Sequence, residues 1–176
     1  MVYGAIDQKS EEGYTCLQSL FKAIDNQQLN YNWLITNFEG YPEDEEVADK
    51  LNQEYCWLSG EELTQIIEKE DFQWIWGLLS GFEKDIPCSE IFQYPLPETE
   101  ISSHWDTPIF IQHKLATIEV LAFDSSLTIF KSREKELVDK FRAYYKESED
   151  LEEYNKKKFE FGILKDSTHL LSFNFI

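Results

Sequence analysis

Residues 72–79 read Phe-Gln-Trp-Ile-Trp-Gly-Leu-Leu, and this stretch constrains the fold more than any other part of the sequence. Apolar side chains occupy both alternating sets of positions, so a strand formed here would bury both of its faces. Such a strand belongs in the middle of a sheet that is covered on both sides. We therefore predict a central strand here, with Phe72, Trp74, Trp76 and Leu78 on one face.

The chain before this stretch alternates between strand and helix patterns. Runs of apolar and aromatic or β-branched residues predict strands, at 2–6, 31–38 and 54–58. Helix start signals and apolar side chains at helical spacing predict three helices, which begin at about residues 10, 42 and 59. The third start combines Ser59 with Glu62 three residues later, which is the pattern of a capping box.

The chain after Pro108 continues with strands and one clear helix. Strands are predicted at 109–113, 117–123 and 127–130, with a tight turn at 124–126. A helix from Ser132 to Tyr145, an acidic connector at 148–154 and a closing hairpin of strands 159–164 and 170–175 complete the chain. The predicted strands and helices do not alternate in regular βαβ units. They predict a single α+β domain over residues 1–176, with a mixed or antiparallel sheet packed with about three to four helices.

Residues 81–107 form the least regular part of the sequence. Three of the five prolines lie here, Pro87, Pro95 and Pro97, together with Ser89, Ser102 and Ser103. We predict a long ordered loop with one turn of helix. A loop of this length inside a compact domain is often functional or mobile.

Charge is distributed unevenly along this acidic chain, whose formal net charge is −18. Residues 1–107 contain 22 acidic and 5 basic residues, whereas residues 108–176 contain 12 acidic and 11 basic residues. The phosphates of nucleic acids and anionic membrane surfaces would both be repelled, so we expect neither as a partner. The excess of acid either serves solubility alone or forms a face for a basic partner.

The cysteines and the first residues bear on the compartment. Cys16, Cys56 and Cys88 are widely spaced and form no CxxC motif, which favours a reducing compartment over a disulfide framework. Residues 1–12 lack the basic and apolar regions of a signal peptide, and no apolar run approaches the ~20 residues of a membrane helix. We expect a cytoplasmic protein.

Motifs for catalysis or cofactor binding are missing from the sequence. The glycines form neither GxGxxG nor GxxxxGK[ST], so we expect no nucleotide cofactor. His104, His113 and His169 are too far apart in sequence to suggest a zinc site. Residues 103–106 contain Ser, His and Asp, but neighbouring side chains on an extended chain point apart. We predict no catalytic and no metal-binding residues.

Two features of the sequence suggest binding to another protein. Glu43, Asp44, Glu45 and Glu46 form a compact acidic run suited to attracting a cationic surface. Trp105 lies in the polar loop, and an exposed tryptophan there would be a good anchor for a partner. The alternative is that the loop folds back and buries Trp105.

The chain resembles small, acidic, uncharacterised proteins of Gram-positive bacteria. The resemblance is carried by Asn32–Ile35, Ser59–Leu63, Phe72–Phe82 and the hairpin Asp124–Phe130 with its helix. The chain is also similar in style to the immunity proteins that are encoded beside bacterial toxins. This resemblance implies a non-enzymatic binding role and brings no functional residue with it.

Three hypotheses for function follow. The first is a non-enzymatic, acidic protein-binding domain that neutralises a basic protein such as a toxin, with the acidic run for steering and Trp105 as the anchor. The second is a small hydrolase-type enzyme that uses carboxylates in a cleft near residues 81–107. The third is a structural subunit of a larger assembly. The sequence leaves the oligomeric state open.

Overall fold

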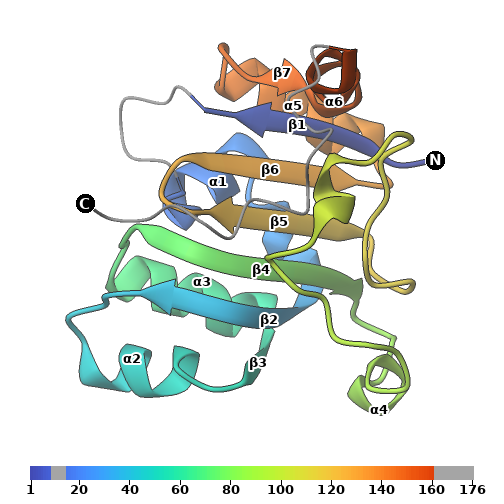
Figure 1. Ribbon diagram of the computed structural model, residues 1–176. Helices are drawn as coiled ribbons and strands as arrows, with labels where there is room; N and C mark the ends of the chain where they lie inside the picture. Colours follow the sequence, from blue (N-terminus) through green and yellow to red (C-terminus); the bar gives the residue numbers. More distant parts are fainter. Residues whose placement is uncertain (9–14, 161–176) are drawn as a thin grey trace, which may run out of the picture.

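A seven-stranded sheet runs through the molecule (Figure 1). The computed structural model describes residues 1–8 and 15–160. The strands are β1 (Tyr3–Asp7), β2 (Tyr31–Gly40), β3 (Tyr55–Ser59), β4 (Trp74–Glu83), β5 (Ile118–Phe123), β6 (Leu127–Ser132) and β7 (Glu149–Asp150). Their order is β3-β2-β4-β5-β6-β1-β7, and every neighbouring pair is antiparallel. The predicted α+β class with an antiparallel sheet is confirmed.

Six α-helices are present in the described residues, more than the three to four predicted. They are α1 (Leu17–Ala23), α2 (Glu45–Leu51), α3 (Gly60–Lys69), α4 (Cys88–Ile91), α5 (Lys135–Tyr144) and α6 (Leu151–Glu160). Two 3₁₀ turns accompany them, η1 (Gln27–Asn30) and η2 (Ser102–Trp105).

Helix α6 replaces both the predicted acidic connector at 148–154 and the start of the predicted strand at 159–164. Its first turn carries Glu152 and Glu153, whereas Lys157 and Lys158 lie in its last turn. This order of charges suits the helix dipole. Lys156 pairs with both glutamates at helical spacing, which adds further support. The rest of the predicted closing hairpin lies outside the described residues.

The two faces of the sheet are covered differently (Figure 1). Helices α1, α3 and α5 pack on one face, where the largest hydrophobic core includes Trp33, Trp74, Phe130 and Phe141. The other face is covered by α6 and by residues 84–117, which we call the strap. We call this second face the strap side.

The strap corresponds to the predicted long loop, although it begins and ends later than the predicted residues 81–107. It contains one helical turn, α4, and the 3₁₀ turn η2. Residues 109–113 form no strand, contrary to the prediction. Instead, Ile109 and Ile111 are buried against the sheet as part of the strap.

Strand β4 lies in the interior of the sheet between β2 and β5, as predicted for a strand that is apolar on both faces. The large side chains of residues 72–79 do not share one face, however. Phe72 and Trp74 belong to the core on the helix side, whereas Leu78 lies on the strap side. The reason is that the register of β2 against β4 shifts twice between residues 36 and 40. Such irregularities change which face a side chain occupies.

The predicted capping box is present at the start of α3. The Ser59 hydroxyl accepts a hydrogen bond from the amide of Glu62 at 3.1 Å, and the Glu62 carboxylate accepts one from the amide of Ser59 at 2.8 Å. The next residue, Gly60, lies directly against the backbone of η1. A Cβ at this position would be 2.8 Å from Cα of Leu29 and would also clash with the carbonyl oxygen of Gln28.

Replacing Gly60 with alanine therefore has the opposite of its usual effect in a helix. Alanine is normally favoured over glycine there by about 1 kcal/mol. We expect G60A to lower the free energy of unfolding by about 2 kcal/mol, because the new methyl group meets rigid backbone. Urea unfolding measures the change, and Q65A, on the exposed side of α3, is the control with little expected effect. A more stable G60A protein would contradict this packing.

Candidate functional site

A buried ion pair lies on the strap side of the sheet. Glu119 of β5 and Lys131 of β6 face each other in register, and Nζ of Lys131 is 2.7 Å from Oε1 of Glu119. Their side chains are only 1% and 2% exposed. Charges removed from water at this depth are costly unless they are paired and hydrogen-bonded. The second carboxylate oxygen of Glu119 accepts a hydrogen bond from the amide of Gln112 in the strap at 2.7 Å.

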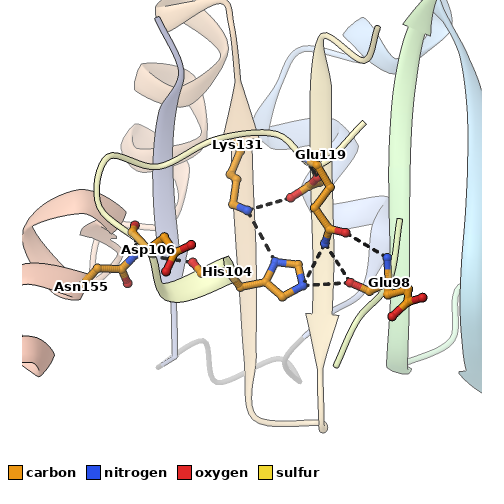
Figure 2. Close-up of polar contacts among 7 residues, drawn as sticks. Glu98, His104, Asp106, Glu119, Lys131 and Asn155 are labelled. Atoms are coloured by element: carbon orange, nitrogen blue, oxygen red, sulfur yellow. Dashed lines mark hydrogen bonds and ion pairs between the residues drawn. The ribbon is translucent and has the colours of Figure 1, made fainter. Parts of the chain in front are cut away.

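His104 connects this ion pair to the strap (Figure 2). Its Nδ1 is 3.5 Å from Nζ of Lys131, and its Nε2 is 3.1 Å from the carbonyl oxygen of Glu98. A lysine ammonium can only donate, so we assign Nδ1 as the acceptor and place the ring hydrogen on Nε2, which donates it to Glu98. The side-chain nitrogen of Gln112, 3.1 Å from Nε2, donates to the same carbonyl oxygen. Burial, and then the charge of Lys131, lower the pKa of His104 from 6.5 to about 4. The ring is therefore neutral at pH 7.

Two amide side chains extend the network on either side. The side-chain amide of Gln112 donates to the carbonyl oxygen of Glu98 at 2.8 Å and accepts from the backbone amide of Glu98 at 3.0 Å. These two hydrogen bonds join distant parts of the strap to each other. Asn155 of α6 donates to the carbonyl oxygens of His104 at 3.4 Å and Asp106 at 3.1 Å. The strap is thus held between the sheet and α6. We call Glu119, Lys131, His104 and Gln112 the buried polar cluster.

The buried polar cluster has the contacts expected of a structural site that fixes the strap to the sheet. Glutamate, lysine and histidine are residue types that transfer protons in enzymes. Here, however, both oxygens of Glu119 already accept hydrogen bonds, and all three titratable side chains are almost completely buried. The arrangement holds the strap in place and offers no open position for a substrate.

A shallow hollow lies beside the irregular part of β2, where Asn37 has a left-handed backbone conformation. Its volume is about 370 Å³, and its lining residues are Asn37, Phe38, Glu39, Trp76, Glu98, Thr99 and Glu100. The hollow borders residues 98–100, within the stretch 81–107 near which the hydrolase-type hypothesis placed its cleft, and that function stays a prediction. Among the described residues, no group of three or more His, Cys, Asp or Glu side chains could hold a metal ion.

The predicted acidic run lies at the start of α2. Asp44 caps the helix by accepting a hydrogen bond from the amide of Val47 at 3.1 Å. It also pairs with Lys69 of α3 at 2.7 Å, and this contact is the main reason why the pKa of Asp44 is lowered. Glu46 pairs with the same lysine, whereas Glu43 and Glu45 are exposed and form no ion pair with a described residue. Half of the run is thus available to a partner.

Trp105 belongs to η2 and packs over β5 and α6, whereas the acidic run begins α2, which packs beside the edge strand β3. Its ring packs against Phe123 of β5 and Tyr154 of α6, and Nζ of Lys158 lies 4.7 Å above it. The side chain is half-buried by these neighbours. The structure therefore does not bring the predicted anchor and the predicted steering residues together, and the role of Trp105 as an anchor stays a prediction.

The buried polar cluster was not predicted from the sequence, although the sequence contains a signal for it. Strand β5 has one charged residue, Glu119, among apolar neighbours, and β6 has one of opposite sign, Lys131. Two opposite charges in adjacent strands of a predicted hairpin, each at a buried position, indicate a cross-strand pair. The contact with His104 had no such signal, because the strap is irregular.

Comparison of the chain with models of known protein families, with curated proteins and with solved structures finds no match. The resemblance to small acidic proteins of Gram-positive bacteria therefore stays a prediction. Among the helices of the described residues, none is both long and apolar enough to span a bilayer.

Removing Lys131 tests the buried ion pair. We expect K131M to lower the free energy of unfolding by about 3–5 kcal/mol, because it leaves the carboxylate of Glu119 buried without a counter-charge. Urea unfolding should show that the double variant E119Q/K131M recovers most of the loss, since no uncompensated charge remains. The matched control is K135M in the exposed Lys135–Asp139 pair, with little effect expected. Equal losses for K131M and K135M would refute the proposed cost of burial.

Proposed function

We propose that this chain is a non-enzymatic binding protein that captures a basic partner protein with an acidic end. The acidic end consists of residues 39–62, from the end of β2 to the first turn of α3. It contains nine acidic residues and one lysine. This concentration of negative charge is the observation that carries the proposal.

Much of the charge at the acidic end is not neutralised within the molecule. Four of the nine acidic residues form ion pairs, Asp44, Glu46, Glu61 and Glu62. The other five are exposed and form no ion pair within the described part of the chain, namely Glu39, Glu43, Glu45, Asp49 and Glu54. Exposed charges of one sign raise the rate at which an oppositely charged protein associates.

The acidic end also offers apolar contact area. Tyr55 of β3 and Phe92, which follows α4, pack with their ring centroids 4.8 Å apart. They remain 41% and 38% exposed, so a partner can cover both rings. Aromatic rings beside carboxylates suit lysine and arginine side chains, which combine an apolar stem with a positive charge.

Strand β3 lies at the edge of the sheet in the middle of the acidic end. Edge strands tend to associate with one another, and like charges around them prevent this. A second copy of the acidic end would be repelled, whereas a basic segment would be attracted. The same charges thus support solubility and select the sign of the partner.

A toxin or enzyme with a cationic surface is the class of partner that fits this chemistry.

The proposed setting is the cytoplasm. The described cysteines, Cys16, Cys56 and Cys88, form no disulfide with one another, which supports a reducing compartment. The predicted role as a structural subunit of a larger assembly stays a prediction.

The partner can be sought by capture from a lysate of the source cell, with bound proteins washed at low and at high salt and identified by mass spectrometry. We expect a basic protein that is retained at low salt and depleted at high salt. Its association rate should fall as ionic strength rises, because salt screens exposed charges. Retention of no specific protein, or a rate that ionic strength does not change, would contradict the proposal.

Charge-neutralising variants then locate the surface. We expect E43Q/E45Q/D49N to slow association of the identified partner by about tenfold at low salt. The matched control D106N/D124N/E147Q removes the same charge from exposed residues outside the acidic end, and its rate should stay close to that of the wild type. If both triple variants slow association equally, net charge rather than the acidic end attracts the partner.

A further inference from the structure

His104 cannot take up a proton without losing its hydrogen bond with Lys131. Its Nδ1 already accepts from Lys131, and a proton there would remove the acceptor. It would also place two positive groups 3.5 Å apart in a space closed to water. The ring is therefore held in its neutral form by geometry as well as by burial.

The groups around the ring leave little to compensate for a second positive charge (Figure 2). Lys131 from β6 faces Nδ1, and the Glu98 carbonyl and Gln112 amide of the strap face Nε2. Glu119 from β5 is the nearby carboxylate, and both of its oxygens are engaged by Lys131 and Gln112. The carboxylates of Glu98 and Asp106 belong to exposed residues and remain in water.

We infer that the strap is an acid-sensitive latch: protonation of His104 releases residues 98–112 from the sheet while the helix-side core stays folded. The cluster that would be disrupted lies wholly on the strap side. The helix-side core is a separate and larger group of buried side chains. Release would uncover the Lys131–Glu119 pair together with Leu121 and Ile129, and so create a new surface.

The sign of the pH dependence follows from the two forms of the strap. A detached His104 binds its proton with the ordinary pKa of about 6.5, whereas the latched form does so only near a pKa of about 4. The detached form thus binds more protons between these values. The latch is at full strength above pH 6.5 and weakens as the pH falls toward 4. Between pH 7.5 and pH 5, the detached fraction should rise by about 30-fold.

A second histidine of the strap must be separated from this effect. His113 donates from Nε2 to the carbonyl oxygen of Ile91 and accepts at Nδ1 from the amide of Leu115, both at 3.2 Å. Burial lowers its pKa as well, so it acts in the same direction. Its ring lies against Phe82 and Tyr94, not against a lysine.

Hydrogen exchange of the amides of Glu98, Thr99 and Gln112 tests the latch, because these amides hold the strap through side-chain acceptors. After correction for intrinsic exchange rates, we expect their protection in the wild type to fall by about 30-fold from pH 7.5 to pH 5. Amides of β4 and β5 should lose much less. H104Q should remove most of the fall and leave only the contribution of His113, whereas the matched control H113Q should retain most of it.

Two results would overturn the inference: protection of these amides that does not change with pH in the wild type, or an equal fall in H104Q. If H104Q does not fold, the ring resonances of His104 in the wild type decide the matter. Titration with a pKa well below 6.5, coupled to exchange of the strap amides, supports the latch. Titration near 6.5 without any change in the strap excludes it.

Discussion

The ion pair between Lys131 and Glu119 is the constraint on which the strap side of the sheet depends. Two charges in neighbouring central strands must be covered by groups that donate and accept hydrogen bonds. A helix presents few unpaired backbone groups along its length, whereas an irregular segment offers many. The strap supplies the amide of Gln112 to Glu119 and the ring of His104 to Lys131. This requirement explains why an irregular segment, and not a further helix, covers the ion pair on the strap side.

The elements that the sequence predicted well are those with strong local patterns. The doubly apolar stretch at 72–79 predicted the interior strand β4, and the pair Ser59 and Glu62 predicted the capping box of α3. The prediction that Trp74 shares a face with Leu78 was wrong. The shift of register that separates them arises in the pairing of β2 with β4, which the sequence of one strand alone does not reveal. The prediction of a strand at 109–113 was also wrong. Ile109 and Ile111 are apolar because the strap packs on the sheet, and the strap does not pair with a strand there.

The candidate site was predictable only in part. The acidic run was evident, and its position at the start of α2 follows from the helix signals around it. That Lys69 neutralises Asp44 and Glu46 required the tertiary structure, since α2 and α3 are separated by β3. The contact between His104 and Lys131 joins an irregular segment to a strand, and no periodic pattern encodes such a contact. The molecule thus combines an acidic end, for which we propose a basic partner, with a strap that is fixed to a buried ion pair.

The protonation state and tautomer of His104 provide the most direct test of how the strap is held. Nitrogen NMR of the imidazole at pH 7 distinguishes the two neutral tautomers from the charged ring. We expect a neutral ring with its hydrogen on Nε2 and an unprotonated Nδ1 that accepts from Lys131. A hydrogen on Nδ1, or a charged imidazole at that pH, would contradict it, because neither can accept a hydrogen bond from Lys131 at Nδ1.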